Sequence, residues 1–215
     1  MVRSQLDHIV VTAPFLEAGV AYVRQALGVS PQAGGEHSRM GTHNCLLKLG
    51  GKLYLEVIAV NPQAPAPQRP RWFQLDTVDP SWPARLATWV ARTNDIRAAV
   101  TASPIPLGTV EPMSRGRLNW LITVSADGSM PLDGVAPALI QWPEGVHPGA
   151  GLRESGCSLV RLEAFHPQAR EADAMLTAIG FEGDVRVSAL PAGREPYLVA
   201  HIQMAAGMRR LGSRE

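Results

Sequence analysis

One acidic side chain in this 215-residue sequence stands where a buried strand is expected. Glu56 lies in residues 55–58, a segment that is otherwise apolar. A carboxylate buried without a partner costs roughly several kcal/mol, so a histidine, an arginine or a metal ion must neutralise it. His8 is one candidate, because it stands on another apolar segment, residues 6–11. The pair could transfer protons or begin a metal site; the simpler alternative is a satisfied ion pair lining a cavity.

A first group of elements must position these two side chains. Residues 5–12 read as a buried strand, and Pro14 suits the start of an amphipathic helix that ends near Gly28. Residues 30–40 indicate an irregular strand, and residues 42–49 and 52–60 indicate a hairpin. The pattern predicts a β-α-β-β-β module with His8 on its first strand and Glu56 on its last.

The strand–helix pattern then returns twice. A fainter copy has a strand at 86–93 and a helix at 95–103, and a clearer one begins at residue 159 and has a helix from Pro167 to Gly180. Strands are also expected at residues 107–113, 118–124 and 136–142. We therefore expect four segments: a first module at 1–62, a Pro-rich linker at 63–83, a second βαβββ module at 84–150, and a C-terminal βαββ unit at 151–215 whose tail after Met204 is a short helix or frayed.

Composition excludes several classes of partner. The net charge is +1, which gives no field that would favour nucleic acid or an anionic membrane. No apolar run reaches membrane-spanning length, and the N-terminus runs directly into a strand, so we expect a cytoplasmic protein. Cys45 and Cys157 follow no metal or redox spacing and read as core residues in a reducing compartment. Exposed module edges favour a homodimer.

Three short motifs carry a resemblance to a known family. They are Gly34-Gly35-Glu36-His37, then Gly41-Thr42-His43-Asn44, then Tyr54-Leu55-Glu56. Residues 139–142 followed by His147-Pro148 add to the pattern, which spans roughly residues 4–170. The chain resembles the glyoxalase-like domain family of the vicinal oxygen chelate superfamily, which includes glyoxalase I, extradiol dioxygenases and bleomycin-resistance binding proteins. The resemblance implies an α+β fold in which repeated βαβββ modules form curved mixed sheets around a cup.

The resemblance also implies where a metal would be held. In that superfamily each module supplies one ligand from its first strand and one from its last, which here gives His8 and Glu56 as ligands of a divalent Fe, Mn, Ni or Zn ion. A third ligand must come from the paired module. The matching positions are Thr88 with Ile140 or Gln141 if the middle unit pairs, and Arg161 with Val199 if the C-terminal unit pairs. Only Gln141 among them suits a metal, so the sequence departs from the complete pattern; His37, His43, His147 and His201 are the possible substitutes.

Three functions follow as hypotheses. The first is a metal-dependent lyase, isomerase or dioxygenase that acts on a vicinal-oxygen substrate, with Glu56 as a ligand that can also serve as catalytic base. The second is a metal-free small-molecule binding protein of the drug-sequestering kind. The third is an interaction module whose cup is filled by its own side chains. The expected substrate-binding residues are His37, Asn44, Trp120, Gln141, Trp142 and Arg161, with plain core or surface roles as the alternative for the tryptophans and Arg161.

Overall fold

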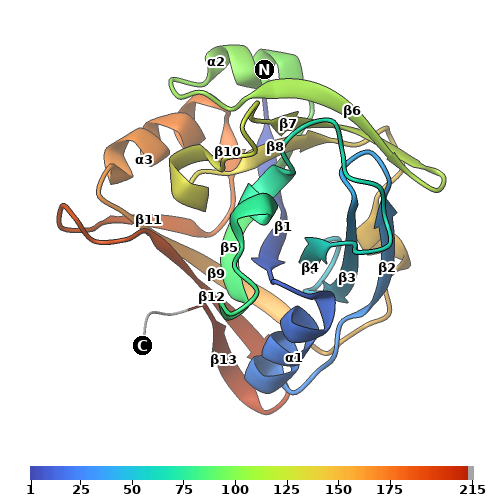
Figure 1. Ribbon diagram of the computed structural model, residues 1–215. Coiled ribbons are helices and arrows are strands. Elements are labelled where there is room, and N and C mark those ends of the chain that lie inside the picture. Colours follow the sequence, from blue (N-terminus) through green and yellow to red (C-terminus); the bar gives the residue numbers. More distant parts are fainter. Residues whose placement is uncertain (213–215) are drawn as a thin grey trace.

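The first two modules share one large curved sheet. The structure is a computed structural model that describes residues 1–212. The first module consists of β1 (Ser4–Thr12), α1 (Leu16–Leu27), β2 (Gln32–His37), β3 (Thr42–Lys48) and β4 (Tyr54–Val60). The second consists of β5 (Arg85–Thr93), α2 (Ile96–Ala102), β6 (Thr109–Arg115), β7 (Leu118–Val124) and β8 (Ala138–Gln141). The strand order is β2-β3-β4-β1-β5-β8-β7-β6, so antiparallel pairing of β1 with β5 joins the modules (Figure 1).

The C-terminal unit forms a second sheet. Its elements are β9 (Ser158–His166), α3 (Ala169–Ala178), β10 (Phe181–Glu182), β11 (Val185–Ala189), β12 (Tyr197–Met204) and β13 (Gly207–Leu211). The sheet order is β11-β9-β12-β13, while β10 pairs with β1 of the large sheet. The expected helix or frayed tail after Met204 is wrong for residues 207–211, because they pair with β12 as a strand. Residues 213–215 lie outside the described part of the chain.

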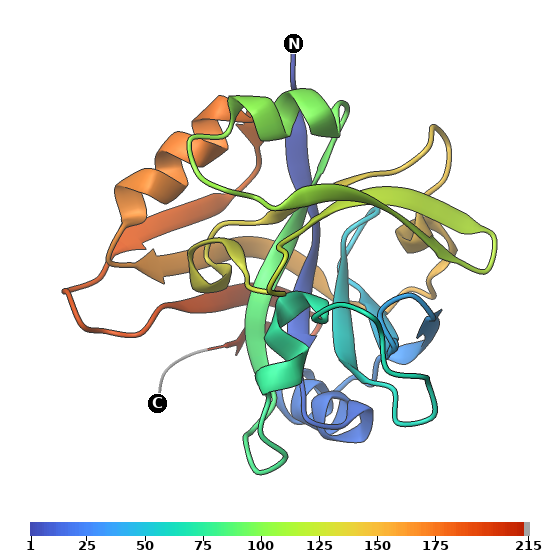
Figure 2. The same cartoon turned by 45° about the horizontal axis from the view of Figure 1, so that its top comes forward.

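Two hydrophobic cores lie on opposite faces of the large sheet. The outer core joins that face to the helices and to the C-terminal sheet, as Figure 2 shows for the orange and red strands beside β1 and β5. It contains Ile9, Val11, Leu55, Trp89, Leu162, Met175 and Ile202, among others. The inner core fills the concave face and contains Val10, Met40, Ile58, Val90, Met113 and Ile140, among others. This arrangement reflects the alternation of side chains along each strand.

Local sequence explains the helix boundaries. Gly28 ends α1 in a left-handed conformation with φ 72°, and its N–H donates to the Arg24 carbonyl. Asp95 caps α2 by accepting a hydrogen bond from the Ala98 N–H at 3.0 Å. Helix α1 packs against β4 and β13, so it lies between the large sheet and the C-terminal one. The first helix therefore holds the outer face of the strand that carries Glu56.

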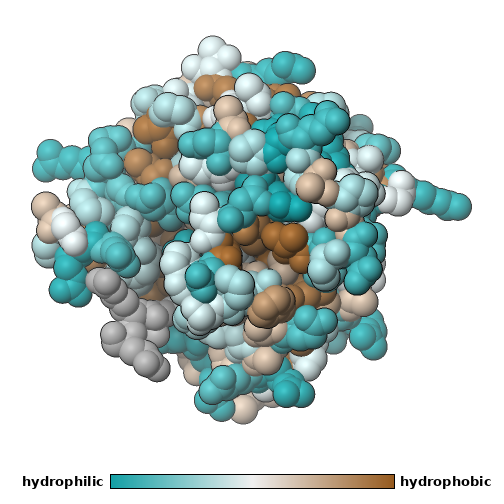
Figure 3. Space-filling view, viewed as in Figure 1, coloured by the Kyte–Doolittle hydropathy of each residue, from teal (hydrophilic) through white to brown (hydrophobic). Residues whose placement is uncertain are grey.

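The segment between the modules covers the cup. It contains η1 (Trp72–Thr77), a pair of short 3-10 turns, in which Trp72, Phe73 and Leu75 are buried in the inner core. Phe73 and Gln74 adopt left-handed backbone conformations with φ 57° and 55°. On the face seen in Figure 3, hydrophobic side chains gather near the centre within a hydrophilic surround. Two further short turns, η2 (Pro131–Gly134) and η3 (Pro148–Gly151), connect the later strands.

Candidate functional site

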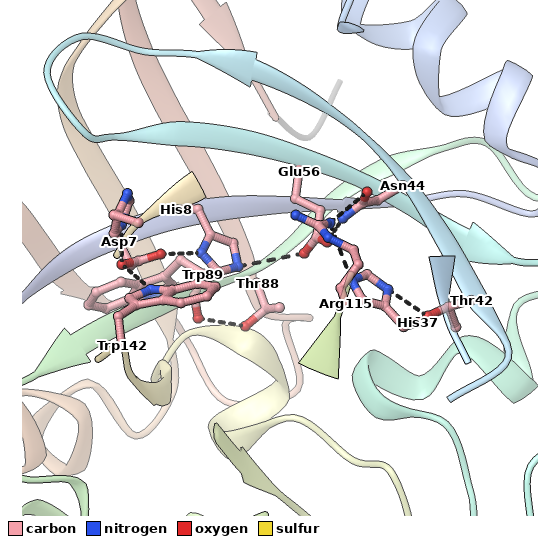
Figure 4. Close-up of polar contacts among 11 residues, drawn as sticks. Asp7, His8, His37, Thr42, Asn44, Glu56, Thr88, Trp89, Arg115 and Trp142 are labelled. Carbon is pink, nitrogen blue, oxygen red and sulfur yellow. Dashed lines mark hydrogen bonds and ion pairs between the residues drawn. The ribbon is translucent and has the colours of Figure 1, made fainter. Parts of the chain in front are cut away.

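The concave face of the large sheet brings together side chains from both modules. Alternate residues of β1 from His8 onward, and of β3 and β4, point inward, among them His8, Asn44 and Glu56. An irregularity between Leu6 and His8 leaves Asp7 without a partner across β5, as a bulge does. Asp7 and His8 therefore contact each other although they are adjacent on a strand (Figure 4).

His8 and Glu56 form a buried pair at the floor of the cup. His8 Nε2 lies 3.5 Å from Glu56 Oε2, and the exposed fractions of the two residues are 4% and 6%. The other ring nitrogen, Nδ1, lies 2.7 Å from Asp7 Oδ1. Tyr54 stacks on the imidazole, with 4.6 Å between the ring centroids. His8 is thus an imidazole held between two carboxylates, and both of its nitrogens are engaged.

Asp7 is the most heavily hydrogen-bonded acid of the site. Its Oδ2 accepts from Trp142 Nε1 at 3.1 Å and from His147 Nε2 at 2.9 Å. His147 Nδ1 accepts from the Gly149 N–H at 3.0 Å, so its proton lies on Nε2 and points to Asp7. With the contact from His8, three ring N–H groups surround one fully buried carboxylate.

Asn44 connects Glu56 to an arginine at the rim. Its Nδ2 donates to Glu56 Oε1 at 2.5 Å, and its Oδ1 accepts from Arg115 Nη1 at 3.0 Å. The Gly35 N–H also donates to Asn44 Oδ1, at 2.9 Å. A Cβ on Gly34 would lie 2.0 Å from Asn44 Oδ1, and one on Gly35 would lie 2.9 Å from Arg115 Cδ. The two glycines leave the space that this chain of hydrogen bonds requires.

His37 lies on the other side of the same arginine. Its Nε2 lies 3.5 Å from Arg115 Nη1, and its Nδ1 lies 3.1 Å from Thr42 Oγ1. Arginine can only donate, so Nε2 is the acceptor and Nδ1 carries the proton. The ring is edge-on to Trp72 and to Trp120, with centroid separations of 5.1 and 6.1 Å. His37 is therefore a neutral side chain in an aromatic wall.

The surroundings fix the charges of these groups. Burial alone would lower the pKa of His8, but hydrogen bonds to Asp7 and Glu56 outweigh it and raise the pKa to about 9. Burial would raise the pKa of Glu56, but the hydrogen bond and charge of His8 lower it to about 2. Hydrogen bonds from His147 and His8 likewise outweigh burial and hold the pKa of Asp7 far below its usual range. Burial lowers the pKa of His37 to about 4. At neutral pH the floor thus holds one imidazolium between two carboxylates.

A small cavity lies above this floor. Its volume is about 30 Å³, room for a water molecule or two. The polar part of the lining consists of His8, His37, Asn44, Tyr54, Glu56 and Arg115. The apolar part consists of Leu46, Trp72, Phe73, Trp120, Ile122, Ile140 and Trp142. A polar floor and an aromatic wall are typical of small-molecule sites.

Comparisons with known proteins place the chain in a family. A hypothetical protein from Staphylococcus aureus superposes with a TM-score of 0.62 and 12% identity, over 96% of this chain and 98% of that protein. A mutant of 4-hydroxymandelate synthase from Streptomyces coelicolor superposes with a TM-score of 0.52 and 15% identity, over 99% of this chain and 63% of that one. No match was found among curated proteins. The model of the glyoxalase-like domain matches residues 6–180. This chain belongs to the glyoxalase-like domain family. The vicinal oxygen chelate fold predicted from the sequence is confirmed.

The donor set of this glyoxalase-like cup does not complete a divalent-metal site. The positions that match the two ligands in the second module are Thr88 and Ile140, and Ile140 has no donor atom. Thr88 lines a neighbouring hollow, where its hydroxyl lies 3.5 Å from the Trp89 carbonyl oxygen. Within residues 1–212 no three His, Cys, Asp or Glu side chains are grouped so as to hold a metal. Two protein ligands fall short of what such ions need.

The structure brings together most, but not all, of the residues predicted for the site. Six of the predicted residues line the same cavity: His8, His37, Asn44, Glu56, Trp120 and Trp142. Gln141 does not, because its Oε1 accepts from the Ile96 N–H at the start of α2, 2.8 Å away. Arg161 does not either, because it stands on β9 of the C-terminal sheet and pairs with Glu163 at 3.2 Å. Neither of these two side chains lines the cavity.

The remaining histidine substitutes take other roles in this glyoxalase-like chain. His147 contacts Asp7 rather than the cavity, and His201 pairs with Glu163 at 2.8 Å. His43 stands between the inward-pointing Thr42 and Asn44 on β3, on the other face. None of the three adds a ligand to His8 and Glu56.

Sequence reasoning missed several residues of the site. Asp7 is not among the predicted site residues, although a carboxylate beside a buried histidine is a recognisable signal. Trp72 and Phe73 fall within the segment predicted as a linker, yet both line the cavity. An aromatic pair within a Pro-rich segment could have indicated a cover for the cup. Arg115 is not among the residues predicted for the site, and the structure places it in the lining of the cavity.

Proposed function

We propose that this glyoxalase-like chain binds a small, largely apolar molecule in its cup without a divalent metal. The observation that carries the proposal is the ion pair of His8 and Glu56. Both nitrogens of His8 face carboxylates, and the opposite side of the cup offers Ile140 where a further ligand would stand. Glu56 already has a cationic partner in His8, so it is not left as a buried, unpaired charge.

The size of the cavity indicates how a ligand would enter. A volume of about 30 Å³ holds no organic molecule, so side chains of the wall must move aside. Phe73 lines both the cavity and a larger hollow of about 390 Å³, which Trp82, Thr77 and Arg85 also help to line. The strained backbone at Phe73 and Gln74 makes this segment the part of the wall that we expect to move.

A thermal-shift screen of small molecules with and without chelator tests the proposal. We expect ligands that raise the melting temperature equally in the two conditions, because no metal takes part. The variant Trp142→Ala removes part of the wall and should weaken these shifts, whereas Phe15→Ala changes an exposed aromatic residue outside the cavity and the hollow and should leave them unchanged. Shifts that appear only when a divalent ion is added would overturn the proposal.

A second function, proton transfer, is favoured by the same buried pair. Glu56 is a carboxylate and His8 an imidazolium, 3.5 Å apart beside an apolar cavity. Glu56 could take a proton from a carbon next to a carbonyl, and His8 could donate one to the oxygen, which would make the chain an isomerase or lyase. Exchange of ligand carbon-bound hydrogen with deuterated water would support this function if Glu56→Gln abolishes it. A ligand that binds without any hydrogen exchange would argue against proton transfer and would leave binding as the function of the cup.

The wider context of the chain stays a prediction. No helix within residues 1–212 is long and apolar enough to cross a membrane. A cytoplasmic location, a homodimer and the four-segment division of the chain are proposals that follow from the sequence.

A further inference from the structure

Arg115 is a cation without an anionic partner at the edge of the cavity. Within residues 1–212 no carboxylate lies within 4.0 Å of its guanidinium. Its Nη1 contacts only neutral acceptors, Asn44 Oδ1 and His37 Nε2. The other arginines near the cup differ, since Arg39 and Arg69 both pair with Glu111. A guanidinium held in place by neutral groups keeps its charge and its remaining N–H donors for something else.

A second donor in the same wall also has no partner. Trp72 is 5% exposed, lines the cavity, and its Nε1 has no hydrogen-bond partner in the described part of the chain. Three buried side-chain nitrogens are left unpaired there, and Trp72 is the residue among them that lines the cavity; the other two are Nε atoms of Arg69 and Arg161. Buried N–H groups are almost always paired, so this one calls for an acceptor.

The polar atoms of His8 and Glu56 at the floor are already engaged, so they do not pair with the Trp72 N–H or with Arg115. Both nitrogens of His8 are engaged, and both oxygens of Glu56 have contacts, from His8 and Asn44. His8 stands between the carboxylates of Asp7 and Glu56, so Arg115 is the cationic side chain of the cavity lining that has no carboxylate partner in the described part of the chain. The remaining lining is aromatic and aliphatic, with Trp120, Trp142 and Ile140 among its members.

We infer that the ligand is a small carboxylic acid with an apolar or aromatic body. Its carboxylate accepts from Arg115 and from the Trp72 N–H, and its body packs against the tryptophan wall. This inference rests on the proposed function, since it names the class of molecule that the metal-free cup binds.

The test compares acids with their neutral counterparts. The probes are six- to ten-carbon aryl and alkyl carboxylates, such as phenylacetate, and their amides, such as phenylacetamide, titrated against the full chain by tryptophan fluorescence and calorimetry. We expect some acid to bind roughly ten- to a hundredfold more tightly than its amide, because a charge-assisted bond replaces a neutral one. Arg115→Gln should abolish the preference, and Arg115→Lys should keep part of it.

Two further variants separate the two donors from general effects. Arg117→Gln removes the same charge from an exposed position on the same hairpin and should leave the preference intact. Trp72→Phe removes only the N–H from a ring that stays apolar, and should weaken acids more than amides. Melting temperatures of all variants confirm that each is folded.

The possible outcomes distinguish the inference from the proposed function. Amides that bind as tightly as acids, or a preference that survives in Arg115→Gln, would overturn the inference and leave metal-free binding in place. If neither acids nor amides bind, both the inference and the proposed function are overturned.

Discussion

Asp7 determines what His8 can do. Its carboxylate holds Nδ1 of the imidazole and is itself held by Trp142 and His147, so it cannot turn away. A fixed, charged neighbour of this kind orients the ring and stabilises its protonated form. Asp7 does not line the cavity, and we therefore regard it as a positioning residue that acts through His8.

The variant Asp7→Asn tests that role. It keeps the shape of the side chain and removes the charge, so the pKa of His8 should fall from about 9 by at least roughly one unit. Heteronuclear NMR of the imidazole nitrogens measures the midpoint directly. Asp173→Asn, a change at an exposed position on α3, should leave it unmoved. An unchanged His8 midpoint in Asp7→Asn would show that Asp7 does not control the ring.

The same charges predict how stability depends on pH. Because the pKa of His8 is raised, its contribution is fully present below the ordinary value of 6.5 and is lost as pH rises through about 9. Because the pKa of Glu56 is lowered, its contribution is present above 4.5 and is lost as pH falls towards about 2. We expect the free energy of unfolding in urea to drop by something on the order of 2 kcal/mol between about pH 6 and pH 10. A smaller drop is expected in Asp7→Asn, and equal drops in the two proteins would contradict the account.

At the scale of elements, periodicity predicted most strands and helices of the first two modules to within a few residues. The expected strand at 118–124 is β7, and the expected helix at 95–103 contains α2. The strands that carry His8 and Glu56 were predicted because their alternation and turns are local properties. The failures depend on long-range contacts. The residue of β8 that points into the cup is Ile140 and not Gln141. Alternation alone cannot decide between them, because Ile140 is buried and Gln141 is half-buried.

The cover of the cup and the role of the C-terminal unit were not predictable in the same way. Proline spacing indicates a loop, but only the tertiary structure places Trp72 and Phe73 over the cavity. Arg161 stands at a strand position equivalent to that of His8, yet its sheet packs behind the large one instead of closing the cup. Repeats in the sequence show that units are alike, and not which of them pair.

Gly34 on β2 offers a test at this scale. A methyl group at Gly34 would lie 2.0 Å from Asn44 Oδ1 and 2.9 Å from the Asn44 carbonyl oxygen. Gly34→Ala should therefore break the contacts of Asn44 and cost about 1 to 3 kcal/mol of unfolding free energy. Gly151→Ala is the matched control, since its added methyl would meet nothing within 4 Å. Equal unfolding free energies for the two variants would mean that the glycine does not protect the Asn44 network.

At the scale of the whole molecule, one outer core ties the two sheets together. Leu162 and Ile202 of the C-terminal sheet, Met175 of α3, and Ile9 and Val11 of β1 belong to the same buried cluster. The cup is thus backed by the third unit, and we expect the chain to unfold in a single cooperative transition.

Substitution of Met175 checks that coupling. Met175 is fully buried, so Met175→Ala should lower the unfolding free energy by about 2 to 5 kcal/mol. The loss should appear equally in tryptophan fluorescence, which reports on the cup, and in circular dichroism. Asp173→Ala, on the exposed side of the same helix, should have almost no effect. Separate transitions for the two probes would show that the C-terminal unit unfolds independently.

The central claim is that His8 and Glu56 satisfy each other and leave the cup free of metal. Elemental analysis of the full chain, purified without chelator and then dialysed against Fe²⁺, Mn²⁺, Ni²⁺ or Zn²⁺, tests it most directly. We expect far less than one ion per chain for each metal, and the same small amount in His8→Ala. About one ion per chain in the native protein, lost in His8→Ala, would contradict the account.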